Sequence, residues 1–248
     1  MLYKPCFFDL YGTLVDIHTD ESTPLLWNTM SHWYTSHGVP YTPASLHTAY
    51  LQQVQAETDA AGRRLAEQGI TVQYPEPDLG RVFRALFKDT GADDALLKET
   101  AQLFRRSSRT RLRLYAGAQD LLKSLKHSGS RVCLLTNAQR LFTEQELQDT
   151  GIHDLFDGIF ISSDYGVKKP DPVFFEMVLQ STGYHPSECL MIGNDLSCDI
   201  LGAQYAGMPG YYIHSNLSPS EDRGKAVPSG CMYQKGMNLK LVQKRIAG

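Results

Sequence analysis

Residues 6–16 read CFFDLYGTLVD, and this stretch decides the fold. A short apolar run of strand character ends abruptly at Asp9, and Gly12 and Thr13 then allow a tight turn out of a sheet. The Asp9 carboxylate is therefore predicted to stand at the carboxyl end of a buried strand. Ligands bind at that edge of an open α/β sheet, so Asp9 is placed for nucleophilic or metal-binding work. An aspartate close to a glycine can also serve only to make a turn.

The composition is that of a globular protein with a substantial core. The chain has 248 residues, of which 42% are hydrophobic and 21% charged, enough for one large domain or a domain with an insertion. The formal net charge is −3 and there is no long basic run, so nucleic acid is not an expected partner. The apolar run before Asp9 is too short for a signal peptide or a membrane span, which predicts a cytoplasmic protein without a membrane partner.

The cysteine pattern favours buried thiols over a disulfide framework or a zinc site. The number of cysteines is odd and none are paired in a CxxC spacing, while three of them lie in apolar runs of strand character. The five are Cys6, Cys133, Cys189, Cys198 and Cys231.

Residues 17–111 are predicted to be helical throughout. Apolar residues recur at helical spacing on both sides of Gly38 and again before Gly91, and Thr42-Pro43 resembles an N-cap followed by proline at the first helical position. Residues 55–77 carry scattered charge, glycine and proline, which predicts a helix end and an exposed loop. This region is therefore expected to be an all-α insertion.

From residue 115 onward, short apolar runs alternate with helical patterns. Strands are predicted at 131–135, 159–161, 189–192 and 211–213, and helices at 118–127, 142–150, 172–183 and 199–207. This alternation predicts an α/β fold, a doubly wound (Rossmann-like) parallel sheet built from residues 1–16 and 112–248, with residues 17–111 inserted as an all-α cap. Residues 214–230 are expected to form a surface loop and residues 237–248 a docked terminal helix.

Polar clusters follow the predicted strands. Asp9, Thr136-Asn137 and Asp195 each come directly after an apolar run, and Lys169 lies in a loop between two of them. Because the carboxyl ends of parallel strands share one edge, these side chains are expected to converge.

The converging groups suit a phosphoryl group and a hard cation. Asp9, Asp195 and Asp199 would bring three carboxylates to one cleft, with Lys169 as the neighbouring cation. Mg²⁺ typically binds through one or two carboxylates plus a substrate phosphate. Thr136, Asn137 and Lys169 can supply donors to phosphate oxygens while Asp9 attacks. Taken alone, a lysine before proline is more often a solvated loop charge.

Four stretches together resemble the haloacid dehalogenase-like (HAD) superfamily, over nearly the whole chain. They have the order and spacing of that family's four motifs: residues 9–16 (DLYGTLVD), 134–137 (LLTN), 166–174 (GVKKPDPVF) and 192–200 (IGNDLSCDI).

The resemblance implies a set of roles. Asp9 would be the nucleophile that forms a covalent aspartyl intermediate, with Lys169 and Thr136 completing the catalytic group. The groups around the transferred phosphate would be Leu10, Tyr11, Thr136, Asn137 and Lys169, and the Mg²⁺ ligands would be Asp9, Tyr11, Asn194, Asp195 and Asp199. Residues 17–111 would be the cap that closes over the site and selects the substrate.

Tyr11 departs from the commonest family pattern. Typical family phosphatases resemble one another in having a second aspartate here, which protonates the leaving group and then activates water. Tyrosine does this poorly, although its backbone carbonyl can still bind Mg²⁺. The Asp-x-Tyr-Gly-Thr pattern resembles that of 2-haloacid dehalogenases, in which the aspartate displaces halide without a metal.

The fourth motif favours a phosphatase instead. Asp195 and Asp199 retain acidic metal positions that such dehalogenases have lost, and the substitution at Asn194 keeps an oxygen donor. Those dehalogenases also resemble one another in an early cap arginine for the substrate carboxylate, and here no arginine precedes Arg63. We therefore expect a Mg²⁺-dependent hydrolase of a small phosphorylated metabolite. The alternatives are a metal-independent 2-haloacid dehalogenase and a catalytically impaired pseudoenzyme that binds a phosphometabolite. Substrate identity and oligomeric state stay open.

Overall fold

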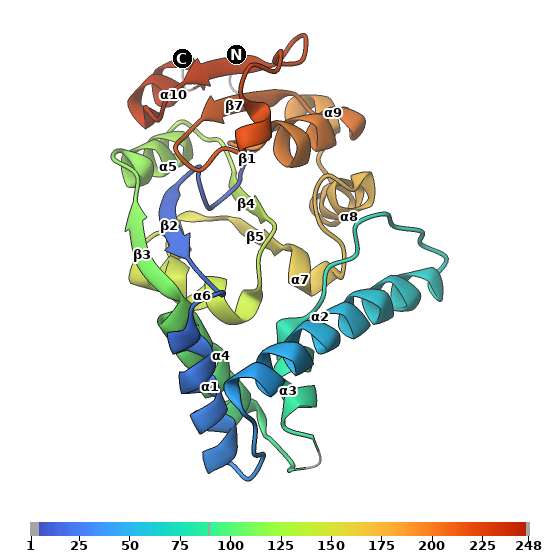
Figure 1. Ribbon diagram of the computed structural model, residues 1–248. Coiled ribbons are helices and arrows are strands. Elements are labelled where there is room, and N and C mark those ends of the chain that lie inside the picture. Colours follow the sequence, from blue (N-terminus) through green and yellow to red (C-terminus); the bar gives the residue numbers. More distant parts are fainter. Residues whose placement is uncertain (1–4, 89, 247–248) are drawn as a thin grey trace.

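The computed structural model describes residues 5–88 and 90–246. Within them, six parallel strands form a sheet in the order β5-β4-β1-β6-β7-β8 (Figure 1). These strands are β1 (Cys6–Phe8), β4 (Val132–Thr136), β5 (Gly158–Ile161), β6 (Leu190–Gly193), β7 (Gly210–His214) and β8 (Met232–Lys235). The predicted α/β fold with a parallel sheet is confirmed.

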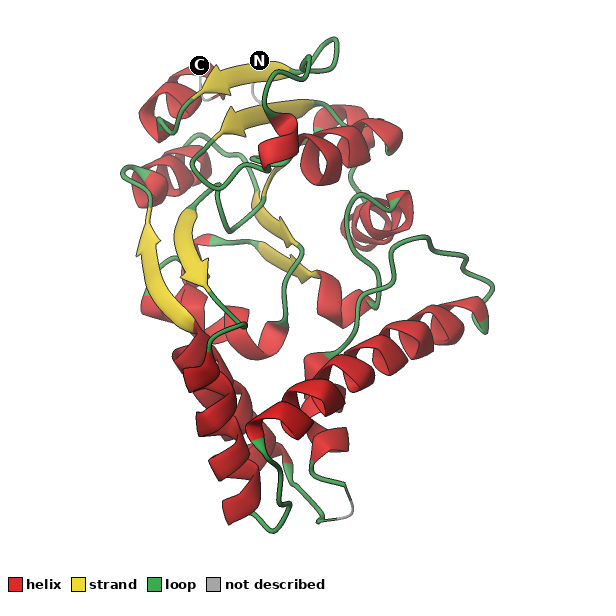
Figure 2. Cartoon of the chain, in the orientation of Figure 1, coloured by secondary structure: helices red, strands yellow, loops and turns green. Residues whose placement is uncertain are grey.

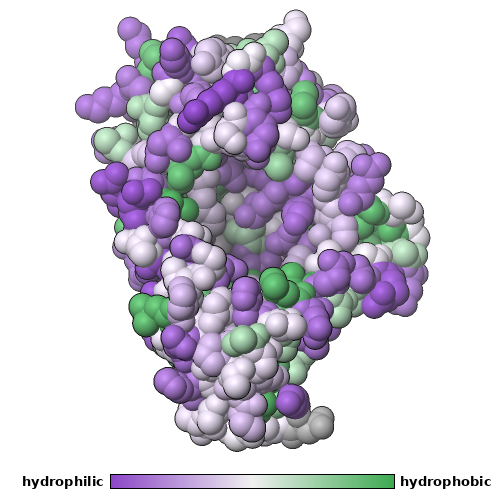
Figure 3. Space-filling view, viewed as in Figure 1, coloured by the Kyte–Doolittle hydropathy of each residue, from purple (hydrophilic) through white to green (hydrophobic). Residues whose placement is uncertain are grey.

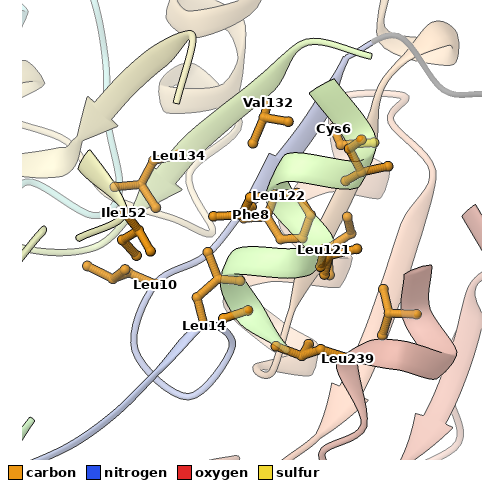
Figure 4. Close-up of a cluster of buried hydrophobic side chains, with 14 of the residues drawn as sticks. Cys6, Phe8, Leu10, Leu14, Leu121, Leu122, Val132, Leu134, Ile152 and Leu239 are labelled. Atoms are coloured by element: carbon orange, nitrogen blue, oxygen red, sulfur yellow. The ribbon is translucent and has the colours of Figure 1, made fainter. Parts of the chain in front are cut away.

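Strand β1 is central, between β4 and β6, and its side chains alternate between two apolar layers. Cys6 and Phe8 join a cluster that includes α5 (Ala118–His127) and α10 (Leu239–Ile246), part of which is seen in Figure 4. Phe7 points to the opposite face, in a cluster with α8 (Pro172–Thr182). This alternation buries β1 on both sides and fixes Asp9 at its carboxyl end.

The remaining connections of the core run over the two faces of the sheet. They contain α6 (Arg140–Asp149), α7 (Ser162–Tyr165), a π-helical turn (Leu196–Leu201) that continues into α9 (Gly202–Tyr205), and three single 3₁₀ turns (His153–Leu155, Pro186–Glu188 and Ser220–Asp222). The π-helical turn begins three residues before the helix predicted at 199.

Two strands that the sequence analysis did not expect stand at the ends of the insertion. Strand β2 (Val15–Thr19) pairs antiparallel with β3 (Arg109–Leu114), as Figure 2 shows. The prediction that residues 17–111 are helical throughout is therefore wrong at 17–19 and 109–111. Leu112 and Leu114 pack on the core cluster while Arg111 and Arg113 are exposed, an alternation of period two that indicates a strand.

Four helices lie between these strands: α1 (Pro24–Ser36), α2 (Pro43–Ala66), α3 (Leu79–Leu86) and α4 (Asp94–Ser108). We call residues 20–108 the cap. Thr42 caps α2 as predicted, but α2 continues to Ala66, so the expected exposed loop at 55–77 begins only after it. The cap has its own apolar cluster, and that cluster includes Phe142 of the core helix α6.

The carboxyl-terminal residues cover the core. Leu239, Val242 and Ile246 are buried, so α10 is docked as predicted as far as residue 246, and residues 247–248 lie outside the described part. Strand β8 was not predicted. No disulfide joins the five cysteines, all of which lie among the described residues. Within residues 5–88 and 90–246, every helix is too short or too polar to cross a bilayer.

Candidate active site

Asp9 is held by three side chains at the end of β1. Lys169 Nζ lies 2.9 Å and Thr136 Oγ1 3.1 Å from Asp9 Oδ1, and Thr13 Oγ1 lies 3.4 Å from Asp9 Oδ2. Two donors therefore fix Oδ1, whereas Oδ2 has one long contact with a neutral hydroxyl. Asp9 is 8% exposed. Oδ2 is thus the less engaged of the two carboxylate oxygens.

Lys169 is a buried cation rather than a solvated loop charge. Its Nζ donates to Asp9 Oδ1, to Asp199 Oδ1 at 2.6 Å and to the Leu135 carbonyl at 2.8 Å, and the residue is 2% exposed. Burial acts to lower the pKa of Lys169, but the carboxylates of Asp199 and Asp9 raise it above its usual value. Lys169 therefore stays protonated at neutral pH.

Asn137 clamps the backbone of Lys169. Its Nδ2 donates to the Lys169 carbonyl at 2.9 Å, and its Oδ1 accepts from the Lys169 N–H at 2.8 Å. Both polar ends of this side chain are therefore engaged within the site. The geometry gives Asn137 a supporting role and leaves its backbone as the part able to meet a substrate.

The side chain of Leu10 points away from the site. Its side chain is fully buried in the core cluster, and its carbonyl accepts from Leu14 N–H at 2.8 Å and Val15 N–H at 2.9 Å (Figure 4). A substrate contact by Leu10 is therefore limited to its backbone N–H.

Tyr11 points its hydroxyl at helix α6. The hydroxyl donates to the carboxylate of Glu146 and lies 3.2 Å from Thr143 Oγ1. Arg105, near the end of the cap helix α4, binds Glu146 through Nε at 2.7 Å and Nη2 at 3.2 Å, and its guanidinium lies over the Tyr11 ring. Arg109 adds a bond from Nη1 at 2.8 Å.

Sequence reasoning missed Glu146, Arg105 and Arg109. Glu146 is 2% exposed and lies between Phe142, Thr143 and Leu147 on the buried face of α6. A charged residue on an otherwise buried helix face was a readable signal that a partner is required. The positions of its partners depend on how α4 crosses α6.

The acidic motif at 194–199 is partly committed to internal contacts. Asp199 accepts from Lys169 through Oδ1 and from the Asp195 N–H through Oδ2 at 3.0 Å, and Asp195 Oδ1 accepts from Cys198 N–H at 2.8 Å. Gly193 makes this approach possible, because a Cβ there would lie 2.1 Å from Asp199 Oδ2. Asp199 is therefore the partner of Lys169.

The remaining oxygens fit a small donor set for Mg²⁺. The Thr13 hydroxyl lies 3.0 Å from Asn194 Oδ1 and 3.4 Å from Asp9 Oδ2, so one amide oxygen and one carboxylate oxygen share a neutral hydroxyl. Mg²⁺ needs few protein ligands when phosphate and water complete its shell. Among the described residues, no three Asp, Glu, His or Cys side chains gather in a geometry that would hold a metal by themselves.

The space between core and cap is hollowed on one face of the molecule. The space-filling view shows a hollow between the two, at the level of the strand ends (Figure 3). A small molecule can enter from this face, and the cap forms its opposite wall.

Comparisons with known proteins agree with this fold. A family model described as haloacid dehalogenase-like hydrolase matches residues 3–207. A phosphoserine phosphatase of Thermus thermophilus is 32% identical over 57% of this chain, and the chain spans only about half of that relative's length (56%). An (S)-2-haloacid dehalogenase of Pseudomonas sp. (strain YL) is 26% identical over 90% of this chain and 87% of its own length. The HAD-hydrolase YfnB of Bacillus subtilis bound to magnesium shares the fold, with a TM-score of 0.54, 19% identity and 99% coverage of both chains.

Proposed function

The chain belongs to the haloacid dehalogenase-like hydrolases, and we propose that it is a Mg²⁺-dependent phosphatase acting on a small phosphorylated metabolite. One observation carries this proposal: Asp9 Oδ1 is fixed by Lys169 and Thr136, while Oδ2 faces only a long contact with Thr13 among the hydrogen bonds of the described residues. A carboxylate held in this way is oriented for in-line attack.

The Asp9 carboxylate attacks phosphorus as the bond between phosphorus and the leaving oxygen breaks, which gives an aspartyl phosphate. With no side-chain acid in place, the leaving group departs as an anion and takes up a proton from water. Lys169 stays protonated through this step and stabilises the negative charge next to Oδ1, and Thr136 keeps the carboxylate from rotating. Water then attacks phosphorus and the bond between phosphorus and the Asp9 oxygen breaks, which regenerates the Asp9 carboxylate, while the protons of the water leave with the released phosphate. Leu10 and Asn137 contribute through their backbone.

The metal ligands in this proposal are Asp9, the Tyr11 carbonyl, Asn194 and Asp195. When bound, Mg²⁺ supplies positive charge that offsets the phosphate oxygens. Asp199 lies in the same acidic motif, and its role in this proposal is to pair with Lys169.

Dehalogenation is the second candidate. Sequence reasoning disfavoured it for want of an early cap arginine, yet the fold brings Arg105 from the other end of the cap to Tyr11. The extended likeness to a haloacid dehalogenase supports it as well. Arg105 is bound through two nitrogens to Glu146, however, so its guanidinium is already engaged. A substrate carboxylate would have to compete with Glu146 for it, which is why we rank this activity second.

The test is release of p-nitrophenol from p-nitrophenyl phosphate, with Mg²⁺ and with chelator, by the native protein and by Asp9→Asn. We expect activity only in the native protein with Mg²⁺. Chloride release from 2-chloropropionate that is insensitive to chelator would replace the proposal with the dehalogenase. Inactivity on both substrates and on a panel of metabolite phosphates, together with tight binding of one of them, would indicate a pseudoenzyme.

A further inference from the structure

A segment of the cap pairs with the loop that carries Lys169. We call residues 73–77, in the connection between α2 and α3, the strap (Figure 1). Glu76 N–H donates to the Gly166 carbonyl at 2.9 Å, and Lys168 N–H donates to the Tyr74 carbonyl at 3.0 Å. The cap is therefore joined to the core at a point far from strands β2 and β3, through which the chain enters and leaves it.

Asp171 reinforces this junction from the core side. Its Oδ2 accepts from the N–H groups of Gln73 at 2.7 Å and Tyr74 at 3.1 Å. Its Oδ1 accepts from Val173 N–H at 3.1 Å and so caps helix α8. Asp171 is 2% exposed and lies two residues after Lys169. One carboxylate thus holds the strap, the Lys169 loop and the start of α8 together.

Gln139 binds the strap from the loop that follows Thr136. Its Nε2 donates to Glu76 Oε1 and to the Pro77 carbonyl, both at 2.8 Å, and its Oε1 accepts from Leu79 N–H at 3.0 Å. Gln139 follows Thr136 by three residues. The loop that carries Lys169 and the loop that follows Thr136 are therefore bound to the same short segment of the cap.

We propose that Asp171 is a positioning residue that, through the strap, keeps the Lys169 loop where Lys169 Nζ reaches Asp9. The physical reason is that loops hold a buried ion pair only when their own backbone is fixed. The strap adds hydrogen bonds to the backbone of Gly166 and Lys168 in this loop, in addition to the bonds of Asn137 to the backbone of Lys169. The inference rests on the proposed function in treating Lys169 as the catalytic partner of Asp9.

Two substitutions of Asp171 distinguish its bonds to the strap from its N-capping of helix α8. Asp171→Ser keeps an N-capping hydroxyl for α8 but is too short to hold the strap as well, whereas Asp171→Ala loses both. Gln139→Met loosens the strap at its other anchor without touching the Lys169 loop. Gln148→Met, on the exposed side of α6, is the matched control.

The measurement is acetylation of Lys169 by acetic anhydride in the folded protein, followed by peptide mass spectrometry and normalised to the exposed Lys123. We expect labelling about tenfold faster in Asp171→Ser and Gln139→Met, because lost buried hydrogen bonds raise local opening by roughly that factor. Gln148→Met is expected to label like the native protein. In the same variants kcat for p-nitrophenyl phosphate is expected to fall more than KM changes.

Native labelling in a folded Asp171→Ser protein would overturn the proposal. If Asp171→Ser does not fold, Gln139→Met decides the question by the same criterion. Faster labelling in a protein that hydrolyses no phosphate ester would leave the strap established and the proposed function rejected, so the two failures are distinguishable.

Discussion

The hydroxyl of Tyr11 donates a hydrogen bond to the carboxylate of Glu146, 135 positions later in the chain. Burial and the charge of Glu146 raise the pKa of Tyr11 above its usual value, and Arg105 acts in the opposite sense with a smaller effect than either. The Tyr11 hydroxyl therefore stays protonated and donates its hydrogen bond to Glu146 on helix α6. The position that holds an acid in typical family phosphatases is occupied here by part of a structural network.

The first prediction concerns the leaving group. With no acid in place, aryl and acyl phosphates are expected to be hydrolysed much faster than alkyl phosphates, by about 10²–10⁴, the usual effect of a positioned acid. Tyr11→Asp is expected to raise the rate for alkyl phosphates, whereas Tyr11→Phe leaves the ratio unchanged. Rates measured across a series of leaving groups test this. A flat series would mean that another residue supplies the proton.

Removing the charge of Glu146 is expected to destabilise the protein in a pH-dependent way. Glu146→Gln leaves Arg105 and Arg109 without their carboxylate, at a cost of about 3 kcal/mol in the free energy of unfolding at pH 7. Burial acts to raise the pKa of Glu146, but hydrogen bonds and charge from Arg105 bring it below the usual 4.5.

A carboxyl group whose pKa is lower in the folded than in the unfolded state makes its full contribution to the free energy of unfolding above its unfolded pKa. That contribution is lost as the pH falls through the folded pKa. The difference in free energy of unfolding between the native protein and Glu146→Gln is therefore expected to be constant above about pH 5.5 and to shrink below pH 4.5. Urea unfolding at several pH values measures it. A difference that grows toward low pH would contradict the ionised state assigned to Glu146.

Gly12 is expected to tolerate no side chain, for two separable reasons. Its φ is +89°, and a Cβ there would lie 2.3 Å from Asn194 Nδ2. Gly129 has a similar φ of +81° with nothing within 4 Å of the same position, so Gly129→Ala measures backbone strain alone, about 1–2 kcal/mol. Gly12→Ala is expected to cost more in unfolding free energy and to lower kcat through the displaced Asn194. If the two substitutions had equal effects on unfolding free energy and on kcat, the role proposed for Asn194 in the site would be rejected.

Phe142 is expected to couple the stability of cap and core. Its ring stacks on Phe104 of α4 with centroids 6.1 Å apart, although Phe142 belongs to α6. Phe142→Ala is expected to cost about 3–5 kcal/mol and Phe142→Leu less than half of that. Limited proteolysis is expected to cleave the cap first in the alanine variant. Uniform cleavage in both parts would argue against a local role.

The sheet and the convergence of polar groups were predictable because they follow from local patterns. Strands β1, β4 and β6 are continuous apolar runs, and a parallel sheet places the residues that follow them at one edge. The four motifs then located Asp9, Thr136 and Lys169, and the structure brings these three together.

What sequence reasoning missed depends on contacts between distant elements. The first half of strand β3, residues 109–111, was assigned to the helical insertion, since the alternation of arginine and leucine in β3 is short and follows a long helix directly. The contacts of Glu146 with Tyr11 and Arg105 arise only where α4, α6 and the end of β1 meet. The hydrogen bonds of Asn137 to the backbone of Lys169 were also missed, because the place of Asn137 in its motif gives no sign of them.

The place of Phe142 bears on how such a protein can be rearranged. The chain enters and leaves the cap through two neighbouring strands, which makes residues 20–108 look like a module that could be cut out and exchanged. The apolar centre of that module contains a ring supplied from outside it. A transplanted cap would carry a hole in its interior, so any exchange between relatives, in evolution or in the laboratory, has to include helix α6 as well.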